Sequence, residues 1–205
     1  MKNNFMPLLA EMESYASIHN VPIINRESGQ LLQAVTAAAN PSSILEIGTA
    51  IGYSTLLLAA NMVPGGQITT IEQDDQRILV AKQFLAQAGV LNQIEIIAGN
   101  AGEVISRLNG SFDLVFIDAA KGQYLDYLEK VMDKLSPGAI VIADNVLFRG
   151  WVLDHQATPR RFRTSVKRLK AYLDFVTNDA RFDTVIHQIG DGMAVSRYQG
   201  EANIL

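Results

Sequence analysis

The chain has 205 residues, of which 48% are hydrophobic and 19% are charged, so it can bury one sizeable core. Cysteine is absent and there are only three histidines, which excludes disulfides, cysteine nucleophiles and cysteine zinc sites and leaves oxygen as the main ligand for any metal. No apolar run is long enough to span a membrane, and the acidic, polar start lacks the apolar core of a signal peptide. We therefore expect residues 1–205 to form a single cytoplasmic domain without a membrane partner.

The elements expected along the chain alternate between helices and buried strands. Residues 1–40 show helical spacing on both sides of the extended stretch "VPIIN", and five short apolar runs follow. The expected strands are 43–49, 67–73, 94–99, 112–118 and 138–145, and the expected helices between them are 53–62, 75–89 and 124–138. Two last strands, 182–189 and 192–198, lie so close together that they should form an antiparallel hairpin. This pattern predicts an α/β fold with a mostly parallel sheet.

The first three strands end in groups suited to an adenosine ligand with a carboxylated tail, because ligands bind beyond the carboxyl ends of such strands. Gly48 and Gly52 would let a ligand approach the backbone, and Ser54 lies at a helix start that can receive an anion. Glu72 stands where an acid can bind a ribose diol, and Asn100 suits the edge of an adenine. The alternatives are a purely geometric role for the glycines and turn chemistry for Asn100.

The fourth and fifth strands end in carboxylate and amide groups. Asp118 follows the fourth strand, Lys121 comes three residues later, and Asp144 and Asn145 follow the fifth. Oxygen ligands of this kind suit Mg²⁺, Mn²⁺ or Ca²⁺. The alternative is a solvated turn with a surface ion pair, but three such groups at the ends of buried strands are harder to explain that way, because burying unpaired carboxylates is costly.

Residues 149–170 form a basic segment with seven Lys or Arg residues and one acid, in a chain whose net charge is −4. Such a segment can attract a polyanion even when the whole chain is acidic. The alternative, which is the more common reason for a charge run, is the solvated face of an amphipathic helix. The candidate nucleic-acid contacts are Arg149, Arg160, Arg161, Arg163, Lys167 and Arg168.

Five segments in order resemble the metal-dependent S-adenosylmethionine O-methyltransferases of the catechol and caffeoyl-CoA type; they are "LEIGTAIGYS", "TIEQ", "FIDAAKGQY", "IADNVLFRG" and "IGDGMAVSRY". The resemblance covers nearly the whole chain. It implies a Rossmann-like class I methyltransferase fold with a seven-stranded sheet, S-adenosylmethionine as cofactor, a homodimer, and a divalent cation, with Mg²⁺ preferred over Mn²⁺ or Ca²⁺.

The resemblance also implies a role for each matched residue. Those expected around the cofactor are Ile24, Glu46, Gly48, Gly52, Ser54, Glu72, Asn100, Ala101 and Asp118, with Glu72 on the ribose and Asn100 and Ala101 near the adenine. Asp118, Asp144 and Asn145 would bind the cation, and Lys121 would be the catalytic lysine. Lys121 would act as a base or as a positive charge that stabilises an oxyanion. Ala119 and Ala120 lack the extra acid of plant members, and no long insertion follows the fifth strand, which disfavours a phenylpropanoid-CoA substrate.

A closer resemblance, which also includes "HNVPI" and "PRRFRTSVKRLKAYLDFV", is to the bacterial tRNA 5-hydroxyuridine methyltransferases of the same superfamily. It implies that the acceptor is a 5-hydroxyuridine and that the basic segment binds tRNA. Two alternatives stay open. One is a small catechol-like substrate whose adjacent oxygens chelate the same cation, and the other is a catalytically silent adenosine-binding or RNA-binding module. The complete set of Asp118, Lys121, Asp144 and Asn145 argues against the silent module.

Overall fold

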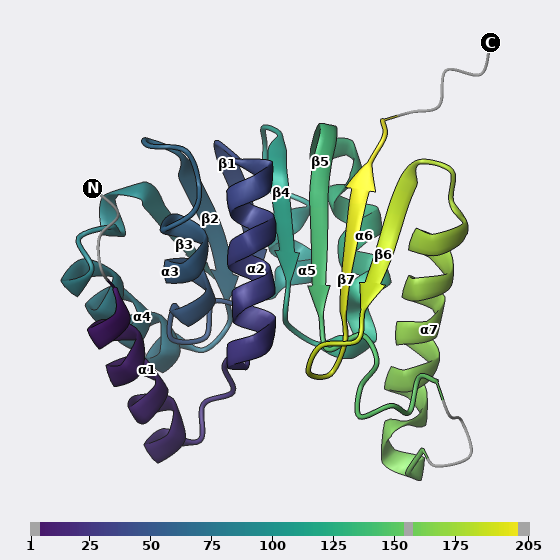
Figure 1. The fold of residues 1–205 in the computed structure, drawn as a ribbon, viewed down its shortest axis with the longest axis horizontal. Helices are drawn as coiled ribbons and strands as arrows, with labels where there is room; N and C mark the ends of the chain where they lie inside the picture. Colours follow the sequence, from purple (N-terminus) through teal and green to yellow (C-terminus); the bar gives the residue numbers. More distant parts are fainter. Residues whose placement is uncertain (1–4, 154–157, 201–205) are drawn as a thin grey trace.

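The computed structural model describes residues 5–153 and 158–200, and its centre is a single seven-stranded sheet (Figure 1). The strand order is β3-β2-β1-β4-β5-β7-β6. The strands are β1 (Ser43–Ile47), β2 (Gln67–Glu72), β3 (Ile94–Ala98), β4 (Phe112–Ile117), β5 (Leu135–Asp144), β6 (Phe182–His187) and β7 (Met193–Tyr198). Strands β1 to β5 pair in parallel, whereas β7 is antiparallel to both β5 and β6. The predicted Rossmann-like α/β fold with an antiparallel C-terminal hairpin is confirmed.

Seven α-helices within the described residues cover both faces of the sheet. They are α1 (Met6–His19), α2 (Arg26–Ala39), α3 (Tyr53–Ala59), α4 (Asp75–Gln87), α5 (Ala101–Ile105), α6 (Tyr124–Val131) and α7 (Arg163–Asn178). Successive side chains of a strand point to opposite faces, so β1 contributes Ile44 to the core beneath α1 to α4 and Leu45 to the core beneath α5 to α7. No helix within the described residues is both long and apolar enough to cross a membrane.

Two short segments differ from the sequence-based expectation. Residues 124–138 were expected to be one helix, but α6 ends at Val131, a 3-10 turn (Met132–Lys134) follows, and β5 begins before Pro137. Leu135 pairs with Phe112, and the register then shifts before the next pair, which leaves Pro137 at an irregular position where its missing N–H is tolerated. The second difference is α5, a short helix that was not expected, whose N-terminus is capped by Asn100.

The basic segment leads into α7 through a 3-10 turn (Arg160–Phe162), while its residues 154–157 lie outside the described part of the chain. Val166, Leu169, Tyr172, Leu173 and Val176 are buried on one face of α7, at the spacing of an amphipathic helix. The predicted amphipathic character of this helix is confirmed.

Candidate active site

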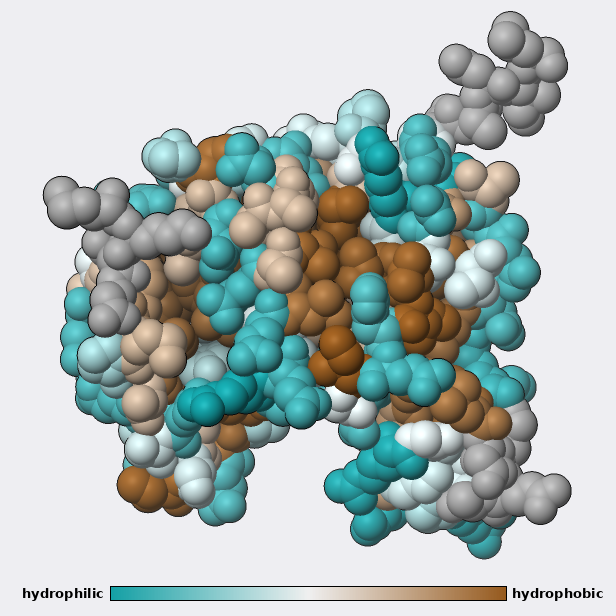
Figure 2. Space-filling view, in the orientation of Figure 1, coloured by the Kyte–Doolittle hydropathy of each residue, from teal (hydrophilic) through white to brown (hydrophobic). Residues whose placement is uncertain are grey.

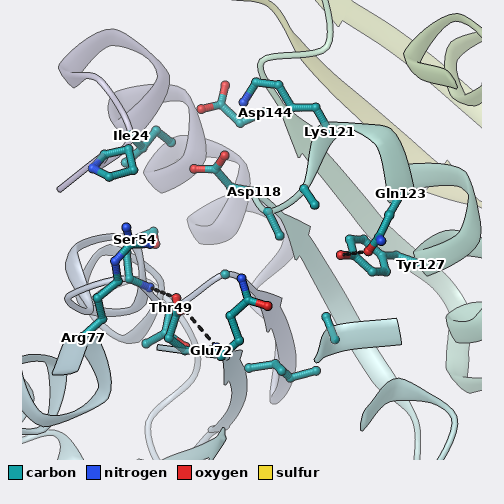
Figure 3. Close-up of a pocket in the computed structure, with 18 of the residues that line it drawn as sticks. Ile24, Thr49, Ser54, Glu72, Arg77, Asp118, Lys121, Gln123, Tyr127 and Asp144 are labelled. Carbon is teal, nitrogen blue, oxygen red and sulfur yellow. Dashed lines mark hydrogen bonds between the residues drawn. The ribbon is translucent and has the colours of Figure 1, made fainter. Parts of the chain in front are cut away.

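A cavity of about 400 Å³ opens at the carboxyl ends of the parallel strands, near the switch in strand order between β1 and β4 (Figure 3). This is where doubly wound sheets bind their ligands. The sequence-predicted residues that line it are Ile24, Gly48, Ser54, Glu72, Asn100, Ala101, Asp118, Lys121, Asp144 and Asn145. Two predicted cofactor residues, Glu46 and Gly52, do not line it. The structure thus gathers segments from the whole chain around one space.

The loop after β1 requires glycine at two positions. Gly48 has φ 108°, and a Cβ atom there would lie 2.3 Å from the backbone oxygen of Asp118, so the loops after β1 and β4 can approach each other only without a side chain. Gly52 has φ 85° and precedes α3, packed against Leu85 rather than facing the cavity. The glycines therefore shape the wall of the cavity by close backbone packing.

Glu46 anchors this loop from behind. Its carboxylate is completely buried and accepts hydrogen bonds from the hydroxyls of Ser54, Thr55 and Thr70. Burial raises the pKa of Glu46 to about 7, against the opposing effect of the three hydroxyl donors. Ser54 lines the cavity and donates to Glu46, so Glu46 is connected to the cavity only indirectly, through the Ser54 side chain.

Glu72 is held by backbone amides at the end of β2. Its Oε2 accepts the N–H of Ala50 at 2.9 Å, and its Oε1 accepts the N–H groups of Gln73 and Asp74 at 2.9 and 3.0 Å. Only 7% of the residue is exposed, yet it lines the cavity. An oriented carboxylate of this kind is suited to accept hydrogen bonds from the two hydroxyls of a ribose.

Asn100 has the turn role that the sequence left open, and it lines the cavity as well. Its Oδ1 accepts the N–H of Gly102 at 3.0 Å and caps α5, which brings Ala101 to the same wall. Both interpretations of Asn100 are therefore compatible.

Asp118 and Asp144 bring two carboxylates together at the ends of β4 and β5. Burial and the charge of Asp118 raise the pKa of Asp144 to about 7. Burial also raises the pKa of Asp118, while the positive charge of Lys121 opposes this shift. Asp144 is completely buried, and its Oδ1 accepts the N–H of Asn145 at 2.8 Å. Its Oδ2 is buried and makes no hydrogen bond of ordinary geometry within the described residues, although the Ser28 hydroxyl is close enough to lower the pKa of Asp144.

Lys121 lies beside the same carboxylates. Its Nζ donates a hydrogen bond of 2.6 Å to Oδ1 of Asn145 and stands 5.8 Å from the centre of the Phe148 ring. Asn145 has φ 55°, a left-handed conformation that turns its amide at the end of β5. Lysine, amide and carboxylates therefore share one corner of the cavity, where Figure 3 shows Asp118, Asp144 and Lys121 close together.

The ligand set of this corner fits a divalent cation. An unpartnered, buried carboxylate oxygen is costly unless a cation or a donor reaches it, and the site offers further oxygens from Asp118 and Asn145. Within residues 5–153 and 158–200, no three acidic, histidine or cysteine side chains form a metal-binding group, so the amide of Asn145 is needed to complete the set. Hard oxygen ligands of this type match Mg²⁺ or Mn²⁺.

The sequence analysis missed several residues that line the cavity: Pro22, Ile23, Thr49, Ala50, Tyr53, Gln73, Arg77, Gln123 and Tyr127. Tyr53 donates a hydrogen bond of 2.7 Å to Glu13 and so joins the wall of the cavity to α1. Gln123 belongs to the segment "FIDAAKGQY", which also contains Asp118 and Lys121. Tyr127 follows one helical turn later. That i, i+4 spacing was the available signal.

The six predicted nucleic-acid residues lie outside the cavity and are exposed. Nη1 of Arg168 donates a hydrogen bond of 3.2 Å to the carbonyl of Gly122, next to Lys121, so the basic surface begins beside the cavity. Arg149 and Arg161 lie over the rings of Trp151 and Phe162, at 5.5 and 4.6 Å. Figure 2 shows a hydrophilic lobe at the lower right, where Figure 1 places the start of α7, and a recess between it and the lobe that contains α1.

Known proteins resemble this chain over nearly its whole length. A family model described as O-methyltransferase matches residues 3–199. The catechol O-methyltransferase of Niastella koreensis is 32% identical, over 92% of this chain and 88% of that protein. The caffeoyl-CoA O-methyltransferase of Stellaria longipes is 29% identical, over 83% of this chain and 73% of that protein. The crystal structure of an O-methyltransferase from Bacillus cereus in complex with SAH is 25% identical with a TM-score of 0.84, and the match covers 94% of this chain and 90% of that one.

The fold and the cavity define a class I methyltransferase that uses S-adenosylmethionine. The chain belongs to the O-methyltransferase family that includes the catechol and caffeoyl-CoA enzymes.

Proposed function

We propose that this protein, as one catalytic domain, transfers the methyl group of S-adenosylmethionine to a ring hydroxyl that has a second oxygen beside it, on a small catechol-like molecule. The observation that carries the proposal is the corner where Lys121, Asn145 and the unpartnered Oδ2 of Asp144 meet. A substrate with two adjacent oxygens can use both to reach a cation held there. The relatives named for catechol and caffeoyl-CoA support a small-molecule acceptor.

The chain binds the cofactor with groups from successive strand ends. Glu72 accepts hydrogen bonds from the ribose hydroxyls, and the Gly48 loop with Ser54 receives the amino-acid tail. Asp118 pairs with the positively charged amino group of that tail, and Ile24 covers it from the N-terminal segment. Asn100 and Ala101 lie along the adenine. Together these contacts hold the cofactor's methyl group toward Lys121.

Asp118, Asp144 and Asn145 would hold the divalent cation, Mg²⁺ in the first instance. When bound, the cation supplies Lewis acidity that lowers the pKa of a coordinated hydroxyl. Lys121 keeps its amine beside the reacting oxygen and either takes its proton or stabilises the negative charge that develops on it. Asp144 is completely buried at this corner, whereas Asp118, Lys121 and Asn145 are half-buried and line the cavity.

A second candidate acceptor is 5-hydroxyuridine in tRNA, whose ring hydroxyl stands beside a carbonyl. The observation in its favour is the exposed basic surface of Arg149, Arg160, Arg161, Arg163, Lys167 and Arg168, which begins next to Lys121 through the contact of Arg168 with Gly122. Such a surface can hold phosphates while a base enters the cavity. A homodimer, expected from the family resemblance, also stays a prediction, and light scattering of the purified protein tests it.

One experiment compares the acceptors directly. Purified protein is incubated with labelled S-adenosylmethionine, Mg²⁺ and, separately, catechol, phenol or tRNA that contains 5-hydroxyuridine. We expect label in the methyl ether of catechol and none in phenol, because phenol lacks the second oxygen. If 5-methoxyuridine carries the label and catechol does not, 5-hydroxyuridine in tRNA replaces the catechol-like molecule as the proposed acceptor. Equal labelling of phenol and catechol would contradict the cation-based mechanism for both.

A further inference from the structure

The far wall of the cavity contains a pair of polar side chains that has no assigned role. The hydroxyl of Tyr127 donates a hydrogen bond to Oε1 of Gln123, and both residues line the cavity. Figure 3 shows this pair on a different side of the cavity from Asp144 and Asp118. The pair is therefore separate from the two carboxylates of the corner where methyl transfer is proposed.

The tyrosine is a fixed donor. Tyr127 is only 3% exposed and belongs to the core cluster beneath α6, so its ring cannot move freely. Burial, with a smaller effect from the charge of Asp126, raises the pKa of the Tyr127 phenol, which therefore keeps its proton at neutral pH. The glutamine oxygen thus accepts one hydrogen bond from a protonated tyrosine, which orients the amide.

The hydrogen bond from Tyr127 orients the amide of Gln123 and leaves its two NH₂ hydrogens, together with the second lone pair of the oxygen, for a ligand. Gln123 precedes α6 but makes no side-chain cap to that helix, and no hydrogen bond of its Nε2 is found within the described residues. Half-buried and lining the cavity, this NH₂ group is a donor without a partner.

The neighbouring walls explain which part of the cofactor would meet this donor. Ala101, Ala119 and Ala120 present only methyl groups, which suit the faces of a flat ring, and Asn100 uses its oxygen to cap α5. Helix α5 packs against α6, and Glu72, Ala101 and Gln123 line the same cavity, so a ring that lies beside Ala101 can extend toward Gln123. Adenine has unprotonated ring nitrogens at its edges, and these are acceptors.

We propose that Gln123, held by Tyr127, donates a hydrogen bond from its side-chain amide to a ring nitrogen of the cofactor's adenine. This assignment deepens the proposed function and rests on it for the presence of the cofactor. Tyr127 acts as a positioning residue, because it sets which end of the amide faces the ligand. With the amide oriented in this way, its NH₂ group favours a base with an acceptor at that edge.

Calorimetric binding of S-adenosylhomocysteine and 5′-methylthioadenosine to the full chain tests the assignment without any turnover. Gln123→Ala should weaken both ligands by roughly 3- to 10-fold, the loss expected for one neutral hydrogen bond. Gln123→Glu should weaken them more, because it replaces the donor by an acceptor. Gln83→Ala, an exposed glutamine on α4, serves as the matched control and should leave both affinities unchanged.

Tyr127→Phe keeps the buried ring and removes only the hydroxyl. It should weaken binding, and adding it to Gln123→Ala should cause no further loss, because the two residues act through one contact. Unfolding curves of each variant confirm that the chain is folded. Unchanged affinity in Gln123→Ala, additive losses in the double variant, or a loss for S-adenosylhomocysteine but not for 5′-methylthioadenosine would overturn the assignment. Failure of the unmodified protein to bind either ligand would instead overturn the proposed function together with it.

Discussion

Two different partners are assigned to the side-chain oxygen of Asn145. In the structure it accepts the hydrogen bond of Lys121, and in the proposed function the same side chain is a cation ligand. A protonated lysine amine and a divalent cation repel each other, so we expect Lys121 to move from Asn145 toward the substrate when a cation is bound. This exchange would place the lysine beside the reacting oxygen only when the cation is present.

Replacing Lys121 by methionine tests this competition. The change keeps the length of the side chain but removes its charge, so we expect methyl transfer to fall by roughly 10²- to 10⁴-fold. Cation binding should tighten by about 10-fold, because a nearby positive charge is lost. Titration with Mn²⁺, followed by electron paramagnetic resonance, measures this affinity independently of turnover. Weaker Mn²⁺ binding in Lys121→Met would show that the lysine supports the site rather than competing with it.

Glu46 gives a prediction about pH and stability. Its pKa is about 7 in the folded chain and 4.5 in the reference state, so the folded chain binds more protons between these values. The stabilising effect of the neutral acid is complete below about pH 4.5 and is lost as pH rises through 7. Glutamine is neutral at every pH. The free energy of unfolding of Glu46→Gln, taken relative to that of the unmodified chain, should therefore be about 3 kcal/mol higher at pH 8 than at pH 4.5. Urea unfolding at both pH values measures this difference, and a pH-independent difference would contradict it.

At the scale of elements, the turn between β6 and β7 organises the segment after β5. Asp191 accepts the N–H of Leu147 on its backbone oxygen at 2.8 Å and the N–H of Arg149 on its Oδ1 at 3.1 Å. Phe148 and Arg149 have φ values of 42° and 58°, left-handed conformations that are costly for residues other than glycine. The contacts of Asp191 therefore hold a strained segment next to Lys121.

Asp191→Ala should release this segment. We expect a loss of about 1 kcal/mol in the free energy of unfolding and a change in the fluorescence of Trp151, the only tryptophan of the chain. Asp191→Asn keeps an acceptor oxygen and should restore both properties almost completely. An alanine variant with unchanged stability and unchanged fluorescence would mean that the segment keeps its conformation without Asp191.

At the scale of the whole molecule, the sheet was the most predictable part. Short apolar runs such as 114–117, repeated between helical segments, indicate buried strands, and the short turn at Gly190–Gly192 favours a hairpin. The strand ends were predictable for the same reason, because parallel strands deliver Asp118 and Asp144 to one edge. The start of β5 was not, since its irregular pairing around Pro137 depends on contacts with β4 that leave no local pattern.

The roles of individual polar residues were less predictable. Glu46 was expected to touch the cofactor, but it lies behind the cavity wall, because a strand pattern cannot tell which hydroxyls will surround a buried acid. Gln123 and Tyr127 were not predicted, because the role proposed for them depends on one hydrogen bond between two uncharged side chains. Their i, i+4 spacing can indicate the hydrogen bond, but their place on the cavity wall depends on how the helices pack.

The basic surface gives a prediction on the same scale. Arg160, Arg161 and Arg163 are exposed and lie outside the cavity, so replacing all three by alanine should leave methyl transfer to catechol unchanged. If tRNA is an acceptor, the same variant should bind it more weakly. The slope of the logarithm of the binding constant against the logarithm of the salt concentration should fall by the amount expected for the loss of roughly two to three phosphate contacts. Filter binding at several salt concentrations measures this, and unchanged binding and slope would show that this surface is not the RNA contact.

The most direct test of the account is the initial rate of methyl transfer to catechol as free Mg²⁺ is varied, for the unmodified protein and for Asp144→Ala. Asp144 is chosen because its buried Oδ2 makes no hydrogen bond of ordinary geometry with any described residue. We predict a rate that rises with Mg²⁺ to saturation in the unmodified protein, disappears with a chelator, and falls by at least about 10²-fold in the variant at every Mg²⁺ concentration. Methyl transfer that continues undiminished in Asp144→Ala with chelator present would contradict the proposed role of this site.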